Sequence, residues 1–336
     1  MNYLIRILVS ILPVVAFLIA LIFLDSYKLV RFRSTLLTVL IGFVTAFICY
    51  LVTSRLTDTP ELGIENYSLY IAPLVEEILK ASYIIYLISS KRVGFMVDAA
   101  IHGFALGTGF AIIENIYYLK SLPDSNLLVW IVRGFGTAVM HGGVTALFGI
   151  VSKSLTERLG SGRIGFFMPG LLMAVIIHSL YTNFFVSPVF SAVILVVGLP
   201  LLMIAVFQQS ETALKKWLGV GFDTDAELLK MITTGNISKT RIGEYLISLK
   251  SRFPGEVVAD MLCLLRIHVE LSIKAKGTLL MREAGFDVPA DRGIKERFDE
   301  LKYLEKNIGK TGRLAILPFL HCSSRDLWQL YMLGKK

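Results

Sequence analysis

Two adjacent glutamates, Glu76 and Glu77, lie inside the apolar segment YIAPLVEEILKASYIIYLISS, which begins at Tyr70. A charged side chain at membrane depth costs about 2.5–3.5 kcal/mol on the insertion scale, and two in succession double that cost. Such side chains therefore face a polar or hydrated interior rather than lipid. The glutamate pair indicates a functional site.

Other ionisable and amide side chains lie in neighbouring apolar segments. With a helical rise of about 1.5 Å per residue, depth in the bilayer can be estimated from position along each segment. This estimate places the two glutamates, Glu114 and His178 in the outer half of the membrane, and His141 nearer the middle. We predict that the carboxylates of Glu76 and Glu114 and the imidazoles of His141 and His178 meet in one polar cavity. The candidate catalytic residues are Glu76, Glu77, Glu114, His141, His178 and Asn183.

The chemistry of this set is hydrolytic. A carboxylate in a site of low dielectric can take a proton from water, and a histidine can share that work. An imidazole or an amide such as Asn183 can donate to the oxyanion that forms when a peptide carbonyl is attacked. No serine lies in a nucleophile-elbow motif and no cysteine lies near the intramembrane histidines, so an acyl-enzyme has no candidate nucleophile.

The sequence leaves two cofactor states open, none or zinc. Carboxylates and imidazoles are zinc ligands, and a zinc site here would lie between helices because the chain has no HExxH motif. Against a metal, Glu76 and Glu77 point about 100° apart on a helix, and Lys80 places a positive charge beside them. This favours the metal-free alternative. A metal-bound alternative would use Glu76, Glu114, His141 and His178.

Several of these residues also have structural interpretations. Glu76 and Lys80 are spaced as an i,i+4 ion pair, and Glu114 could pair with Arg133 on the next segment. His141 lies among small residues, where it could donate to a carbonyl of a closely packed helix. A shared site explains all these groups together better than several unrelated structural roles do.

Other motifs favour structure over chemistry. The spacing of Gly103, Gly107 and Gly109 is typical of close helix packing, not of a nucleotide loop. His102 is spaced as a partner of Asp98. Four residues of the later chain could be combined into a zinc site, but their spacing matches no usual pattern; they are Cys263, His268, His321 and Cys322.

The elements that position these residues are membrane helices. Of the 336 residues, 54% are hydrophobic, and the mean hydropathy is +0.66, which excludes an ordinary soluble protein. We predict an all-α polytopic bundle of about seven transmembrane helices. The first could be a signal peptide, but it lacks a clear cleavage site, which favours a retained helix. The predicted spans are 4–24, 35–52, 69–88, 97–119, 127–151, 164–186 and 189–207.

Charge between the spans alternates. Basic residues follow the first, third and fifth spans, and the opposite connections are acidic or nearly neutral. The positive-inside rule then places the N-terminus outside and the C-terminus in the cytoplasm. The net charge of +8 fits basic loops beside anionic lipid and requires no nucleic-acid partner.

The composition changes after the last span. Residues 1–209 form the predicted transmembrane domain, and residues 210–336 have shorter apolar runs, more charge and helical spacing. We expect the second region to be a cytoplasmic helical domain that can bind a partner. The three cysteines lie in a span or on the cytoplasmic side, so a disulfide framework is not expected.

Four motifs together resemble a known family. They are EEILK at Glu76–Lys80, GFAIIENIYYL at Gly109–Leu119, HGGVTALFG at His141–Gly149, and His178 followed by Asn183. This order is similar to that of the PrsW-type membrane proteases, within the superfamily of CAAX prenyl endopeptidase-like proteases. The resemblance covers about residues 70–190.

The resemblance implies an intramembrane endopeptidase that cleaves a single-span membrane protein, such as an anti-sigma factor. By that resemblance Glu76 is the water-activating base, Glu77 supports it, and Glu114, His141 and His178 belong to the later motifs. The family's last motif is commonly H-x-x-x-N, whereas one extra residue separates His178 from Asn183 here. That residue rotates Asn183 by about 100°, which argues against its role as an oxyanion donor.

Two other classes of function are compatible with the residues. Paired membrane carboxylates also carry ions in proton- or cation-coupled transporters, although no inverted repeat is visible. A non-catalytic membrane scaffold with a partner-binding C-terminal region is the third alternative.

Overall fold

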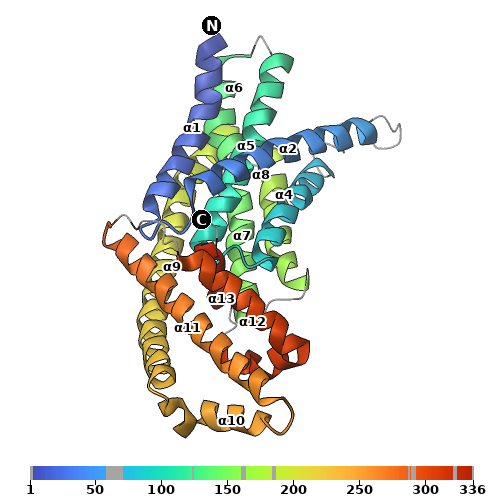
Figure 1. The fold of residues 1–336 in the computed structure, drawn as a ribbon. Helices are drawn as coiled ribbons and strands as arrows, with labels where there is room; N and C mark the ends of the chain where they lie inside the picture. Colours follow the sequence, from blue (N-terminus) through green and yellow to red (C-terminus); the bar gives the residue numbers. More distant parts are fainter. Residues whose placement is uncertain are drawn as a thin grey trace. The chain divides into compact units, whose positions relative to one another are not determined.

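The computed structural model describes residues 3–57, 71–122, 125–159, 164–183, 187–286, 288, 293–320 and 324–334. Throughout these residues the regular structure is helical and no strand forms, so the predicted all-α fold is confirmed. The chain divides into two compact units, Met1–Ser210 and Glu211–Lys336. Figure 1 shows the helices of both units.

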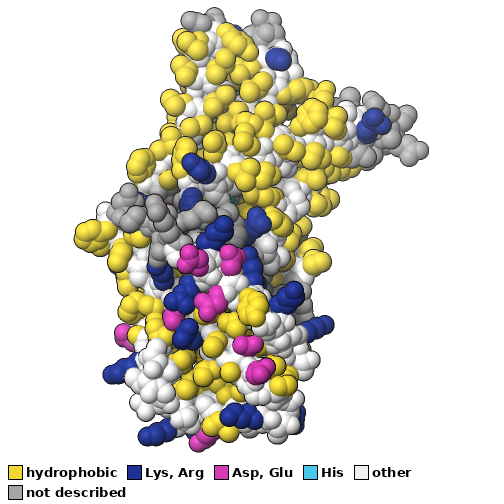
Figure 2. Space-filling view, in the orientation of Figure 1, with side chains coloured by type: hydrophobic (Ala, Val, Ile, Leu, Met, Phe, Trp, Pro, Cys, Tyr) yellow, Lys and Arg dark blue, Asp and Glu magenta, His cyan; other side chains and the backbone are white. Residues whose placement is uncertain are grey.

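The first unit is a bundle of long apolar helices. Its elements are α1 (Tyr3–Leu24), α2 (Phe32–Thr57), α4 (Ala72–Ser89), α5 (Met96–Ser121), α6 (Leu127–Ile131), η2 (Val132–Ala138), α7 (Val139–Leu159), η3 (Ile164–Phe167), α8 (Met168–Thr182) and the start of α9 (Pro188–Thr233). In the view of Figure 2, hydrophobic side chains cover most of this unit, whereas charged side chains gather on the second.

Six stretches of the described chain are long and apolar enough to cross a membrane. They are Tyr3–Leu24, Phe32–Arg55, Met96–Ser121, Leu127–Arg158, Ile164–Thr182 and Pro188–Thr233. The remaining predicted span corresponds to α4, which has 18 residues and includes the charged Glu76, Glu77 and Lys80. The protein is therefore an integral membrane protein with a polytopic helical bundle, and α4 as a seventh span stays a prediction.

Helix α5 lies at the centre of the bundle. Of the residues in its 18-residue apolar stretch, 83% are buried. Its glycines pack directly on neighbouring backbones. A Cβ at Gly103 would approach the Thr145 carbonyl of α7 to 2.5 Å, and one at Gly107 would overlap the carbonyl of His141. This is the close packing that the glycine spacing predicts. It holds α5 and α7 near enough for their polar side chains to meet.

The segment η2 is a π-helix between α6 and α7. It includes Arg133 and leads into the turn of α7 that carries His141. A π-helix places more residues in each turn than an α-helix and often occurs at functional sites. It therefore changes how far along the bundle His141 lies.

The second unit contains the end of α9, η4 (Asn236–Lys239), α10 (Arg241–Leu249), α11 (Gly255–Glu283), α12 (Gly293–Ile316), η5 (Leu317–Phe319) and α13 (Ser324–Gly334). The glycines at positions 219 and 221 lie inside α9 and do not break it. Gly309 bends α12 with a φ of +65°, a backbone conformation that favours glycine.

A buried network in this unit, which we call the C-terminal network, consists of Asp225, Ser272, Lys276 and Gln329. The Lys276 ammonium contacts Asp225 Oδ2 at 2.5 Å, and Ser272 Oγ donates to the same oxygen at 2.5 Å. Gln329 Nε2 donates to Ser272 Oγ at 2.8 Å. The network joins α9, α11 and α13.

Of the four later residues that could be combined into a zinc site, the structure describes Cys263 and His268. Cys49 and Cys263 are free thiols, while His321 and Cys322 lie outside the described residues. His102, near the other end of α5 from Glu114, contacts Thr38 Oγ1 through Nδ1 at 2.9 Å.

Candidate active site

Helix α4 brings three charged side chains to the bundle interior. It begins at Ala72 with Pro73 in its first turn, where the N–H that proline lacks would have no helical acceptor. Glu77 and Lys80 are buried, and the Glu76 side chain keeps 20% of its surface exposed.

Glu77 is held from two sides. Its Oε1 accepts from Lys80 Nζ at 2.5 Å and contacts His178 Nδ1 at 2.8 Å. The ion pair of α4 thus forms between Glu77 and Lys80, and the expected i,i+4 pair of Lys80 with Glu76 is wrong. Because consecutive helical residues point about 100° apart, one lysine cannot serve both glutamates equally.

Glu114 of α5 connects two neighbouring elements. Its Oε2 contacts His141 Nε2 of α7 at 2.8 Å, and its Oε1 pairs with Arg133 Nη2 of η2 at 3.3 Å. The pairing of Glu114 with Arg133 that the sequence suggested is therefore present. Glu114 also has a second contact, because the other oxygen of the same carboxylate contacts His141.

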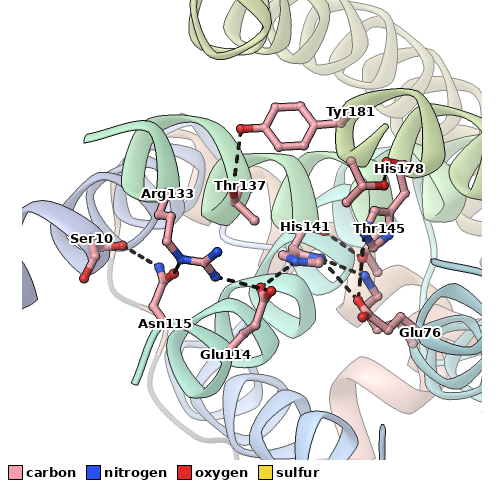
Figure 3. A network of polar contacts seen from close by, with 12 residues as sticks. Ser10, Glu76, Glu114, Asn115, Arg133, Thr137, His141, Thr145, His178 and Tyr181 are labelled. Carbon is pink, nitrogen blue, oxygen red and sulfur yellow. Dashed lines mark hydrogen bonds and ion pairs between the residues drawn. The ribbon is translucent and has the colours of Figure 1, made fainter. Parts of the chain in front are cut away.

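Glu76 completes the cluster from α4. Its Oε2 lies 3.9 Å from His141 Nδ1 and 3.9 Å from His178 Nε2. The two imidazole rings meet edge to face, with centroids 4.9 Å apart. We call Glu76, Glu77, Lys80, Glu114, His141 and His178 the membrane cluster, most of which appears in Figure 3.

The hydrogen bonds define which nitrogen of each ring carries a proton. His141 Nε2 faces Glu114 at 2.8 Å and its Nδ1 faces the Lys80 ammonium at 3.1 Å. The ring must donate to the carboxylate and accept from the ammonium. His178 Nδ1 faces Glu77 at 2.8 Å, so it donates there. Toward Glu76, His178 turns its Nε2, and His141 turns the Nδ1 that also lies beside the Lys80 ammonium.

Glu76 Oε2 has no hydrogen-bond partner in the part of the chain that the structure describes, although the atom is buried. A buried carboxylate oxygen without a donor is costly and calls for an explanation. Glu76, His141 and His178 each place one atom that could bind a metal ion within 4.8 Å of the corresponding atoms of the other two residues. A water molecule or a cation between these three atoms would give Glu76 Oε2 the partner that it lacks.

These residues fit a zinc ion. Tetrahedral zinc ligands lie roughly 3.4 Å from one another when each is about 2.1 Å from the ion, so separations of 3.9 Å need small adjustments. Metal-bound histidines usually donate their other nitrogen to a carboxylate, as both do here. Against zinc, the Lys80 ammonium lies 3.1 Å from His141 Nδ1. The three residues are thus compatible with zinc, and zinc stays a prediction.

Five of the six predicted catalytic residues thus meet in space, and the sixth is bonded elsewhere. Asn183 caps the end of α8 and donates from Nδ2 to the Ser179 carbonyl at 2.7 Å. His141 contacts Glu114 at 2.8 Å, and its greater depth in the membrane stays a prediction.

Sequence reasoning missed the connection between the cluster and α1. Asn115 Nδ2 donates to the Ser10 carbonyl at 2.8 Å, and Arg133 Nε donates to Asn115 Oδ1 at 2.9 Å. Asn115 was visible as an amide within a span. Its acceptor is a backbone atom of a distant helix, which no side-chain pattern reveals.

Carboxylates and imidazoles held between the helices of a membrane bundle are typical of a membrane-embedded hydrolase. Residues 30–208, more than half of the chain, match the model of the PrsW family intramembrane metalloproteases. The chain therefore belongs to this family. No curated protein and no solved structure matches the chain.

Membership in this family identifies the protein as an enzyme, an intramembrane protease. The match begins at residue 30 and includes all of the membrane cluster, whereas α1 and the whole second unit lie outside it. The transporter and scaffold alternatives are not retained.

Proposed function

We propose that this protease cleaves single-span membrane proteins and that Glu76 activates the attacking water. The observation that supports this most strongly is the buried Oε2 of Glu76, which lies 3.9 Å from one nitrogen each of His141 and His178. A water molecule there can donate to Glu76 while its oxygen faces a substrate carbonyl.

In the proposed reaction, Glu76 takes a proton from water as the water oxygen forms a bond to the peptide carbonyl carbon. The carbonyl π electrons move to its oxygen, giving a tetrahedral oxyanion. The oxyanion then re-forms the carbonyl and the carbon–nitrogen bond breaks, while the proton held by Glu76 passes to the leaving nitrogen. The step needs no other reactant than water and the peptide.

Glu76, His141 and His178 would hold zinc, whose role when bound is to polarise the carbonyl and favour ionisation of water. The two oxygens of Glu76 allow its carboxylate to bind a cation and accept a proton. Glu77 and Glu114 orient His178 and His141 through the hydrogen bonds described above. Lys80 balances the charge of Glu77 in this buried setting.

The proposed substrate is a membrane protein with one span, of which an anti-sigma factor is one kind. The proposed topology places the N-terminus outside and residues 210–336 in the cytoplasm of a bacterium, because the basic loops alternate with acidic or neutral ones. The cytoplasmic region would bind a partner that the membrane unit cannot reach.

The substrates can be identified from the new N-termini that cleavage creates. Membranes from cells that produce either the wild-type protein or Glu76→Gln are compared by chemical labelling of these termini. Glutamine keeps the shape of glutamate and removes the base. We expect new termini within or beside single membrane spans that occur with the wild-type protein alone, at equal amounts of the two proteases in the membrane.

Two outcomes would contradict the proposal. In one, no new terminus depends on Glu76. In the other, the dependent termini lie only in soluble proteins.

A further inference from the structure

We propose that Arg133 is a positioning residue that fixes Glu114 on His141, and that α1 anchors it through Asn115. This inference rests on the proposed function for its catalytic consequence. We call Arg133, Asn115 and the Ser10 carbonyl the arginine clamp. Figure 3 shows the clamp leading from Ser10 to Glu114 and His141.

The clamp is a continuous chain of contacts. Asn115 donates to the Ser10 carbonyl at 2.8 Å and accepts from Arg133 Nε at 2.9 Å. The guanidinium then pairs with Glu114 at 3.3 Å, and Glu114 contacts His141 at 2.8 Å. Both ends of the Asn115 amide are satisfied only in this orientation, since its neighbours are a carbonyl and a cation.

The Arg133 guanidinium contacts an aromatic ring with its face, in addition to the polar groups that it contacts with its edges. Its Cζ lies 3.7 Å from the centroid of the Tyr118 ring, one turn after Glu114 on α5. A guanidinium over an aromatic face gains cation–π attraction. Arg133 can then reach Asn115 and Glu114 at once because its donors form a rigid planar fork, which a lysine lacks.

The backbone of α1 is shaped to meet η2. Pro13 lies inside α1 and has no N–H, so the Val9 carbonyl receives no helical hydrogen bond from it. Gly134, next to Arg133, packs so closely there that a Cβ would overlap the Val9 oxygen. The π-helix and α1 therefore approach at the same turn that supplies the Ser10 carbonyl.

The consequence for the cluster is geometric. Arg133 holds one oxygen of Glu114, so the other oxygen stays at 2.8 Å from His141 Nε2. This contact fixes the plane of the His141 ring, whose Nδ1 lies 3.9 Å from Glu76 Oε2. Since α1 precedes the matched residues 30–208, it contributes to the site from outside the region that the family model covers.

The test uses two readouts on the full-length protein in lipid nanodiscs, for Arg133→Gln, Arg133→Lys and Asn115→Ala. The first readout is ¹⁵N NMR of histidine-labelled protein, in which the 5 histidines are assigned by single replacements. We expect Arg133→Gln to change the His141 nitrogen signals and to leave those of His268 unchanged. Thermal unfolding of each variant confirms folding.

The second readout is cleavage of a substrate found by terminus labelling. We expect Arg133→Gln to lower kcat by about 10- to 100-fold, the usual effect of a residue that orients an active-site histidine, with KM little changed. Arg133→Lys should recover part of this loss, and Asn115→Ala should lose less than Arg133→Gln. The exposed Arg55, replaced by glutamine, is the matched control and should behave as wild type.

The outcomes separate the two proposals. His141 signals that are the same in Arg133→Gln and wild type would overturn the clamp, whatever the activity. A folded Arg133→Gln protein with a normal kcat would also overturn it. A wild-type protein that cleaves nothing would overturn the proposed function, and the NMR comparison would still decide whether Arg133 positions Glu114 and His141.

Discussion

The membrane cluster and the C-terminal network both bury charged side chains, but they differ in how completely they satisfy them. In the C-terminal network, Asp225 receives Lys276 and Ser272 at 2.5 Å each. Among the described residues, Gln329 Oε1 of this network has no hydrogen-bond partner, and it belongs to a neutral amide. In the membrane cluster, the oxygen without a partner in the described part of the chain is Oε2 of the carboxylate Glu76.

The surroundings of the two networks differ in the same way. Lys276 lies 5.1 Å from the Trp217 ring centroid, in addition to its ion pair with Asp225. Around Glu76, one nitrogen of each histidine lies 3.9 Å from Oε2, beyond hydrogen-bond distance. A buried carboxylate oxygen without a donor calls for a partner, whereas a carboxylate held by an ammonium and a hydroxyl does not. Buried charge alone therefore does not identify a site.

The largest expected effect compares two buried histidines. His178→Ala removes an acceptor beside Glu76, and we expect cleavage of a single-span substrate to fall by about 100-fold or more. His268→Ala, in the second unit, should keep near-normal turnover. Reconstituted protein with matched amounts of each variant measures both. A fully active His178→Ala protein would remove this residue from the site.

The next effect concerns stability rather than activity. Lys276→Met leaves Asp225 buried without its cation, and breaking such a pair costs about 3–5 kcal/mol. The double variant Asp225→Leu/Lys276→Met should recover most of this loss, because paired apolar side chains can replace a buried ion pair. Chemical denaturation monitored by Trp fluorescence tests this. If the double variant is no more stable than Lys276→Met, the network is more than a structural pair.

The smallest effect is expected at Asn183. Its amide donates to the Ser179 carbonyl at 2.7 Å, within its own helix, so Asn183→Ala should lower kcat by less than about threefold. Such a loss is small beside the 10²–10³ that removal of an oxyanion donor costs. A 100-fold loss of kcat at unchanged stability would restore Asn183 as an oxyanion donor.

Much of the membrane cluster could be predicted because ionisable residues in apolar segments have few alternatives. Glu76, Glu114 and His178 stand out for the cost of leaving each in lipid. The glycines of α5 likewise predicted close packing, which the approach of Gly107 to the His141 backbone confirms. These inferences depend on residue type and spacing, which a sequence contains.

Other features depend on rotation and local geometry, which spacing does not define. Whether Lys80 pairs with Glu76 or Glu77 depends on which side of α4 faces α8. The level of His141 depends on the π-helical turn of η2, because a depth estimate assumes an α-helical rise throughout. The link from Asn115 to α1 depends on a backbone carbonyl. Each of these required the three-dimensional arrangement.

The most direct test of the central claim is anomalous diffraction at the zinc edge from crystals of the active, purified protein. We expect one peak about 2.0–2.2 Å from donor atoms of Glu76, His141 and His178. The peak should be absent from Glu76→Gln crystals grown in the same way, while the C-terminal network shows none in either. An active protein with no peak at these three residues, or with its peak elsewhere, would contradict the assignment.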